Sequence, residues 1–303
     1  MKLTIECQAA FLVELYRAVR AACTGDFLLL CFQDDIMTIQ DENKTFSTQS
    51  WVEIDITHQS YFKTYSVKSK HPKNRVVLKC VYNEFLEGLQ ASSSLAGTKV
   101  IIQLATSEMR VFLEFACEVP EDEDTFFYEK QVSVVIEKSN ESIVPEIPNS
   151  IECELACSQR LQHFLFPVTG TESLLHICLT VEDCHVCRPK DSKDLDYVLK
   201  CSHNRKNFSL SQTCKLTAMS KETSPFQLIC SFLNLNLQHG QCSLYNIKTL
   251  VKTKDLVNVL QKTNGLNWEK VMFGIQHESE IIISASWKAS FHVRFIVSAQ
   301  ADE

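Results

Sequence analysis

Four residues of types that commonly bind zinc lie within twenty positions of one another, at Cys184, Cys187, Cys201 and His203. A C-x-x-C pair followed by two more Cys or His residues is typical of structural zinc sites. Here one residue separates the second pair, which fits the usual zinc knuckle poorly. On a strand, residues three apart also point to opposite faces. This metal site is a weak candidate, and we predict no metal.

No other residue pattern indicates catalysis. The chain holds only seven glycines, scattered along its length, and no phosphate-binding glycine-rich loop. It lacks a G-x-S-x-G elbow and a H-E-x-x-H helix. The acidic groups Asp34-Asp35 and Glu121–Asp124 fall in expected turns without a recognisable partner. We therefore predict a protein without enzymatic activity and without a cofactor.

Basic side chains recur on one face of segments with helical spacing. The candidate phosphate-contacting residues are Arg17, Arg20, Arg160, His163, Lys252, Lys254 and Lys262. In the first helix they lie opposite the apolar residues Leu12, Leu15, Tyr16 and Val19. Contacts of this kind go to phosphates and carry no base information. Ordinary solvated helix faces remain the alternative, and the second helix offers Glu84 and Glu87 instead of a base.

Two further basic clusters lie in expected loops. They are Lys68–Arg75, with the sequence KSKHPKNR, and His203–Lys206, with the sequence HNRK. Such clusters can act as nuclear-import sequences or contact phosphates, and they are also common in plain solvated turns. The sequence leaves the three alternatives open.

Strands dominate the pattern that must position these residues. Apolar runs of strand length alternate with four segments of helical period, at Ala9–Ala22, Tyr82–Ser94, Ala156–Phe166 and Thr253–Thr263. Each half of the chain therefore reads as two β-α-β-β-β units, with an insertion at Asp183–Pro225 in the second half. A fourfold repeat of a unit that cannot bury its own apolar face predicts an α+β fold built from larger sheets.

A polar segment with Pro145 and Pro148 separates the two halves. Proline lacks a backbone donor and disfavours a central strand, so the segment is expected to be an extended connector. We predict an N-terminal domain at 1–137, a connector at 138–149 and a C-terminal domain at 150–303. The acidic run Glu118–Asp124 is expected to form a solvated loop between the last two strands of the first half.

The composition is that of a globular protein, with 45% hydrophobic and 22% charged residues among 303. No apolar run is long enough to span a bilayer, and the N-terminal segment is interrupted by charges, unlike a signal peptide. We expect a soluble intracellular protein whose fourteen cysteines are mostly reduced and buried. The net charge of −7 excludes a uniformly basic surface, but not a local basic stripe.

The repeat and the connector resemble the proliferating-cell nuclear antigen (PCNA) superfamily of sliding clamps. The chain resembles the Hus-one subunit family of the checkpoint (nine-one-one) clamp more closely. The segments that carry the resemblance are Met1-Lys2, Trp51–Asp55, Tyr61–Tyr65, Val77–Leu89, Val132–Ile136, Val144–Pro148 and Phe291–Ala299. It covers nearly the whole chain, although the insertion at Asp183–Pro225 departs from the family layout.

The resemblance implies a DNA-clamp fold, with helices on the inner face and sheets outside. It also implies a subunit of a heterotrimeric ring that encircles double-stranded DNA without sequence specificity and serves as a platform in damage signalling and repair. The implied partners are two clamp-like subunits, a clamp-loader ATPase, and repair and checkpoint proteins, in the nucleus and secondarily the cytoplasm, with no membrane. A homotrimeric replicative clamp and a zinc-stabilised adaptor are the alternatives.

The resemblance further implies two kinds of contact surface. Ile143, Val144 and Ile147 would border a pocket for partner peptides beside the connector, although they can equally pack onto the domain beneath. Neighbouring subunits would meet through edge strands. The candidate edges are Val111–Cys117 in the first domain and Tyr197–Cys201 or its neighbour in the second.

Overall fold

A computed structural model of the full chain describes most of the first half and parts of the second. The described residues are 1–42, 48–57, 61–94, 99–121, 124–137, 151–154, 174–181, 214–220, 227–232, 235–237, 246–264, 268–276, 280–287 and 290–300. They divide into two compact units. The first comprises Met1–Thr45, Ser50–Pro145 and Ser286–Arg294, and the second holds the remainder.

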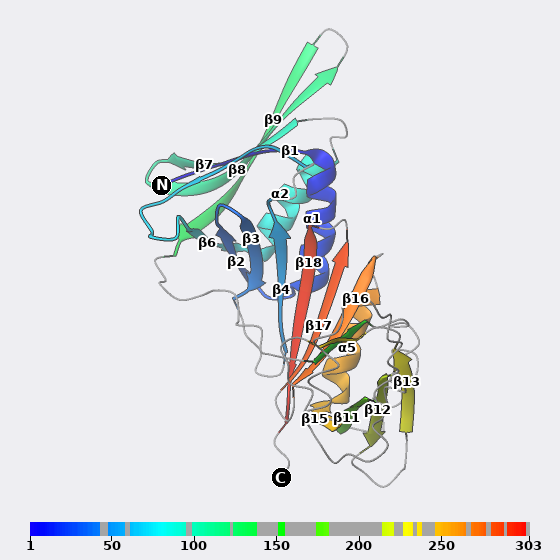
Figure 1. The fold of residues 1–303 in the computed structure, drawn as a ribbon. Helices are drawn as coiled ribbons and strands as arrows, with labels where there is room; N and C mark the ends of the chain where they lie inside the picture. Colours follow the sequence, from blue (N-terminus) through cyan, green and yellow to red (C-terminus); the bar gives the residue numbers. More distant parts are fainter. Residues whose placement is uncertain are drawn as a thin grey trace. The chain divides into compact units, whose positions relative to one another are not determined.

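The first unit contains the β-α-β-β-β pattern twice, with one extra strand between the repeats (Figure 1). Its elements in chain order are β1 (Lys2–Gln8), α1 (Ala9–Ala22), β2 (Phe27–Phe32), β3 (Ile36–Asp41), β4 (Thr48–Asp55), β5 (Phe62–Lys68), β6 (Val76–Val81), α2 (Tyr82–Ser93), β7 (Lys99–Ser107), β8 (Arg110–Glu121) and β9 (Asp124–Ile136). The sheet order is β4-β3-β2-β6-β9-β8-β7-β1-β5.

The second unit carries the corresponding strands and one described helix. Its elements are β10 (Ile151–Glu154), β11 (Leu174–Val181), β12 (Cys214–Ser220), β13 (Gln227–Phe232), β14 (Leu235–Leu237), β15 (Asn246–Lys252), α5 (Thr253–Asn264), β16 (Lys270–Gln276), β17 (Glu280–Trp287) and β18 (Phe291–Ser298). Residues Ser286–Arg294, at the end of β17 and the start of β18, belong to the first unit, where β18 lies beside β4. In the second unit β13-β12-β11-β15 form a sheet of their own.

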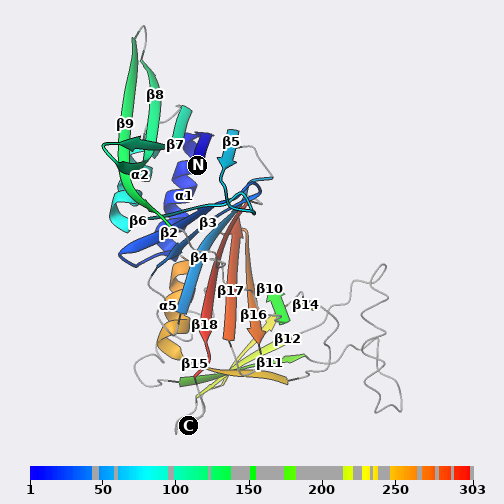
Figure 2. The same cartoon turned by 90° about the vertical axis from the view of Figure 1, so that its left-hand side faces the viewer.

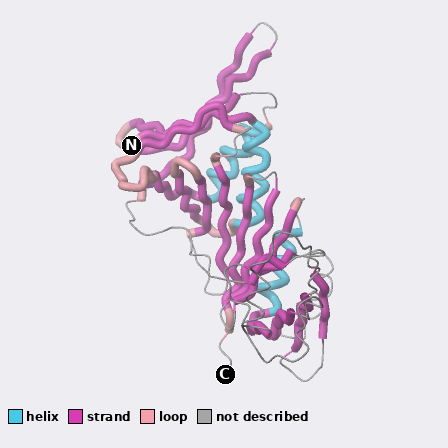
Figure 3. The backbone as a smooth tube through the Cα atoms, in the orientation of Figure 1, coloured by secondary structure: helices cyan, strands magenta, loops and turns pink. Residues whose placement is uncertain are grey.

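The strands of the first unit bury alternate side chains beneath two helices that lie side by side (Figure 3). In β1, for example, Leu3, Ile5 and Cys7 are buried while their neighbours are not. Helix α2 approaches this face closely at Gly88, where an added Cβ would lie 3.1 Å from Phe115 Cε2 and 3.2 Å from Val132 Cγ2. Glycine thus sets the spacing between α2 and the sheet.

The helices expected at Ala9–Ala22, Tyr82–Ser94 and Thr253–Thr263 are confirmed, each within one residue at its ends. The helix expected at Ala156–Phe166 and the strand expected at Tyr197–Cys201 lie outside the described residues. So does the connector, and the predicted boundaries at 137 and 150 stay a prediction.

The structure corrects one sequence-based expectation about strands and adds two strands. Within the acidic run, Glu118–Glu121 and Asp124 are not in a loop, because β8 and β9 stay paired up to Glu121 and Asp124. Strand β5 is not among the strands that the pattern predicts. The end of the insertion at Asp183–Pro225 contains a regular strand, β12, that pairs with β11 and β13.

No helix among the described residues is long and apolar enough to span a membrane.

Candidate nucleic-acid interface

Helix α1 presents two arginines to solvent. Its buried residues recur with helical period, at Ala9, Phe11, Leu12, Leu15, Ala18, Val19 and Ala22, and Arg17 and Arg20 are exposed on the other side. Arg20 lies in the last turn, where a positive charge interacts favourably with the helix dipole. Both arginines are thus exposed on one face of α1, and their contact with DNA stays a prediction.

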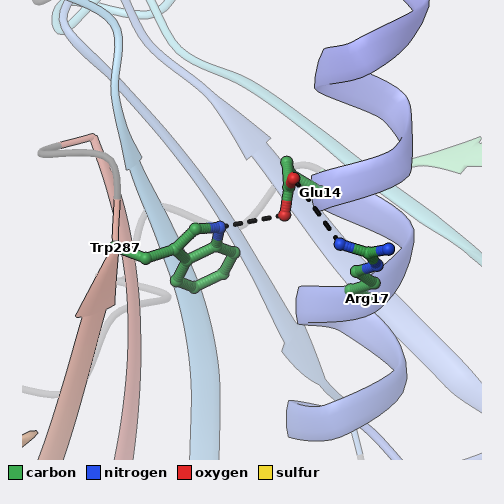
Figure 4. A network of polar contacts seen from close by, with 3 residues as sticks. All are labelled: Glu14, Arg17 and Trp287. Atoms are coloured by element: carbon green, nitrogen blue, oxygen red, sulfur yellow. Dashed lines mark hydrogen bonds and ion pairs between the residues drawn. The ribbon is translucent and has the colours of Figure 1, made fainter. Parts of the chain in front are cut away.

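Arg17 is held by a chain of polar contacts that starts outside the helix (Figure 4). The indole Nε1 of Trp287 donates to Glu14 Oε2 at 3.1 Å, and Glu14 Oε1 lies 3.7 Å from Arg17 Nη1. Trp287 in turn stacks on Phe291, with ring centroids 4.8 Å apart. The Glu14 carboxylate therefore positions the guanidinium and also partly neutralises it.

Arg20 differs from Arg17 in its partners. No carboxylate of the described residues forms an ion pair with it, so its charge is not compensated locally. Of the two arginines, Arg20 offers phosphate the stronger unshielded charge, and Arg17 the better-fixed geometry.

Helix α2 contributes acidic and neutral groups to its exposed face, namely Asn83, Glu84, Glu87 and Gln90. Glu87 is paired with Lys130 of β9, with Nζ and Oε2 3.3 Å apart. The exposed faces of α1 and α2 together are therefore only asymmetrically basic, as their sequences indicate.

Helix α5 and the residue before it supply the lysines of the second unit. Lys252 and Lys254 are exposed, whereas Lys262 is half-buried. The opposite side of the helix packs through Leu256, Val257 and Leu260. Lys254 and Lys262 thus lie on the polar side of an amphipathic helix that Lys252 precedes, and Lys262 is the least accessible of the three.

The remaining candidate residues lie outside the described part of the chain. These are Arg160 and His163, the connector residues Ile143, Val144 and Ile147, and the metal candidates Cys184, Cys187, Cys201 and His203. Among the residues that are described, no three His, Cys, Asp or Glu side chains group as metal ligands would.

The sheet face opposite the helices carries a polar ladder. Gln103 Nε2 and Gln131 Nε2 donate to the two oxygens of Glu114, at 2.8 and 3.2 Å. On the same face Glu6 lies 3.2 Å from both Lys63 Nζ and Lys99 Nζ. Although desolvation opposes them, these bonds hold the pKa of Glu6 below its usual value. The outer face of the sheet is therefore polar around these contacts.

Two solved structures are similar to this chain over nearly its full length. One is PCNA from Thermococcus kodakaraensis, with a TM-score of 0.61 and 11% identity, covering 98% of this chain and 100% of that one. The other is PCNA from Entamoeba histolytica, with a TM-score of 0.59 and 10% identity, covering 99% of each. This chain has the fold of a PCNA sliding clamp. The predicted α+β clamp fold is confirmed.

The comparisons of sequence give no match: no family model matches this chain, and no curated protein does. At 10–11% identity the likeness to the two PCNA structures establishes the fold alone.

The candidate edge strand of the first unit needs a correction. Val111–Cys117 lies inside the sheet, because β8 is paired with β7 on one side and with β9 on the other. An edge is open instead along part of β9, which pairs with β6 only through Val134–Ile136. No described strand pairs with the far side of Asp124–Ser133. Period and polarity could not reveal this, because β8 and β9 read alike in sequence.

Proposed function

We propose that this chain is a non-enzymatic subunit of a heterotrimeric, DNA-encircling clamp of the checkpoint type, a platform for damage signalling and repair. The observation that carries the proposal is the full-length match to the PCNA clamp fold. The checkpoint type rests on the residues that resemble the Hus-one subunit family, such as Trp51–Asp55 and Val144–Pro148.

The internal repeat supports assembly into a ring. In the first unit, β18, the last strand of the second half, lies beside β4, the fourth strand of the first half. The repeat has a second such pair of strands: β9, the last strand of the first half, and β13, the fourth strand of the second half. Among the described strands, β13 ends its sheet, and the side of β9 away from β8 has no partner along Asp124–Ser133. Edges of this kind are completed by strands of a neighbouring chain.

Exposed apolar side chains on β9 support the same assignment. Phe127 is 77% exposed and Val135 61% exposed, and both lie on the face of β9 turned away from α2. Aromatic residues are enriched where proteins bind one another. We propose that β9 of this chain meets the β13 position of a neighbouring clamp subunit.

The mass of the purified chain separates two kinds of clamp. A checkpoint-type subunit needs two different partners, so the chain alone is expected to run as a monomer in light scattering after size exclusion. The replicative alternative is favoured by the PCNA name of both similar structures. A stable homotrimer would establish that alternative and exclude the heterotrimeric assignment.

The basic helix faces are proposed to contact the phosphates of the enclosed duplex. Changing Arg17, Arg20, Lys254 and Lys262 together to Gln is expected to lower the slope of log affinity against log salt by up to roughly 0.9 for each phosphate interaction removed. The measurement is DNA association of the assembled ring between about 50 and 200 mM salt. Glu84→Gln with Glu87→Gln is the control, because it leaves every base in place. An unchanged slope would remove these residues from the DNA interface.

The remaining partners follow from the same proposal. A ring must be opened to admit DNA, so a clamp-loader ATPase is a proposed partner, and the nucleus is the proposed location. Ile143, Val144 and Ile147 of the connector are the proposed border of a site for partner peptides. Imaging of the tagged chain before and after DNA damage tests the location, and a chain excluded from nuclei would contradict it.

A further inference from the structure

A cluster of four lysines lies at one end of the first unit's sheet. Lys2 of β1 and Lys68 of β5 are directly opposite in the antiparallel pair, and Lys70 and Lys73 follow in the next turn. All four are exposed, and none forms an ion pair with a carboxylate of the described residues. Like charges directly opposite one another destabilise a strand pair. The facing pair Lys2 and Lys68 is therefore held at an internal cost, and Lys70 and Lys73 add two uncompensated charges beside it.

The turn that carries Lys70 and Lys73 is fixed mainly by the side chain of Asn74. Asn74, at φ 45°, accepts from Ser69 N at 2.9 Å and donates to Val67 O at 2.9 Å and Asp34 Oδ1 at 2.7 Å. Asp34 is the acidic side chain that is bonded to the turn, and the hydrogen bond from Asn74 occupies one of its carboxylate oxygens. The lysines are thus presented from an ordered turn, which lowers the entropy cost of binding a partner.

The backbone of this turn offers little to a phosphate. The amides of Ser69, His71, Lys73 and Asn74 all donate within the turn, to Asn74 Oδ1, Ser69 Oγ, His71 Nδ1 and His71 O. A phosphate nest needs free amides. An anionic ligand is therefore left with the lysine side chains. Such a set of charges binds a carboxylate as readily as it binds the phosphates of a nucleic acid.

Strand β5 gives the cluster a second feature. It ends the sheet, with β1 as its one neighbour among the described strands. Figure 2 shows β5 beside the first unit's other elements, and its far side presents backbone donors and acceptors that no described strand uses. Lysine on an edge strand deters pairing with a second copy of the same edge. Lys2 lies on the inner neighbour β1, where it adds no such protection. An extended peptide is the ligand that uses both the free edge and the charges.

We propose that β5 binds an extended acidic peptide segment of a partner protein, which adds to the sheet as a strand and places carboxylates against Lys2, Lys68, Lys70 and Lys73. This site is separate from the helix faces proposed for DNA. It requires neither ring formation nor DNA, so it can fail or hold independently of the clamp assignment.

Binding of a fluorescein-labelled peptide of five Glu-Thr repeats to the full chain tests the proposal by fluorescence anisotropy at low salt. We expect saturable binding. Changing all four lysines to Gln should weaken it about 30-fold, as expected for the loss of four exposed ion pairs. The matched control removes four charges elsewhere, by Arg20→Gln, Lys252→Gln, Lys254→Gln and Lys262→Gln, and should bind the peptide like the unchanged chain.

A second probe tests strand addition. The same peptide, N-methylated at every residue, keeps its charge but has no backbone N–H to donate along either edge, and we expect it to bind at least about tenfold more weakly, the loss of one or two net hydrogen bonds. Equal binding of the two peptides would overturn strand addition. Equal losses in the two four-charge variants would overturn the site.

Two further outcomes are decisive. Duplex DNA that competes with the peptide only when the four lysines are present would make this a nucleic-acid surface and overturn the proposal. Since Lys68→Gln relieves the repulsion from Lys2, its thermal unfolding midpoint should not fall below that of the unchanged chain. This single variant therefore tests binding even if the fourfold variant unfolds.

Discussion

Single residues in the first unit act through partners far away in the sequence. Glu14 and its hydrogen-bond donor Trp287 are separated by 273 positions, yet together they orient Arg17 on α1. Near the same strand, Arg294 Nη2 lies 3.2 Å from Glu53 Oε1. The helical period alone places Arg17 and Arg20 on the exposed face of α1. No local pattern could predict which of the two has a carboxylate partner.

The burial of His292 predicts that the stability of the folded chain depends on pH. Its burial lowers its pKa below the usual 6.5, an effect that Glu53 opposes, Arg294 strengthens and Asp55 opposes. As the pH falls below about 6.5 the unfolded chain therefore takes up a proton that the folded chain does not, so stability is lost down to the folded pKa. His292→Gln should flatten this loss.

The measurement is the free energy of unfolding in urea between about pH 7.5 and pH 5.5, for both proteins. If the free energy of unfolding changes equally with pH in both proteins, His292 is not the group responsible for the loss of stability.

At the scale of elements, the described helices were predictable and strand neighbours were not. Helix α1 matches its predicted bounds because its apolar stripe is long and strongly periodic. Strand β5 escapes prediction because Lys63, Thr64 and Ser66 interrupt its apolar residues. Which of β8 and β9 forms the edge depends on long-range pairing, which the composition of a strand does not encode.

The contact of α2 with the sheet gives an element-scale prediction. Gly88→Val places methyl groups against the fully buried Phe115 and Val132, so overpacking should lower stability by about 1–3 kcal/mol. Gln90→Val, at an exposed position of the same helix, is the matched control and should change stability by less than about 0.5 kcal/mol. Chemical unfolding of the three proteins measures both. Equal stabilities would mean that α2 can move away from the sheet.

At the scale of the whole molecule, the repeat determines which edges remain open. The pairing of β18 with β4 leaves β9 and β13 as the corresponding edges. The sequence could predict the duplication, because apolar runs and helices recur in the same order. It could not predict the open edges, because these depend on which strands already have neighbours.

Ring assembly should depend on the exposed side of β9. Phe127→Asp places a charge at the centre of the proposed contact and should weaken association with the partner subunits at least about tenfold. Met109→Asp is the matched control, because Met109 is also apolar and fully exposed but lies in the turn between β7 and β8. Co-purification of the three subunits at increasing dilution measures the difference. Equal losses in both variants would point to general solubility instead of a β9 contact.

Five thiols of the first unit, at Cys7, Cys23, Cys31, Cys80 and Cys117, are free and buried. Burial raises the pKa of both Cys7 and Cys80 to about 12, so almost no thiolate is present at neutral pH. Alkylating reagents therefore reach these sulfurs only when the unit opens. Mass spectrometry of the labelled peptides would give the time course for each cysteine. It would show where this half of the molecule unfolds locally, without any engineered probe.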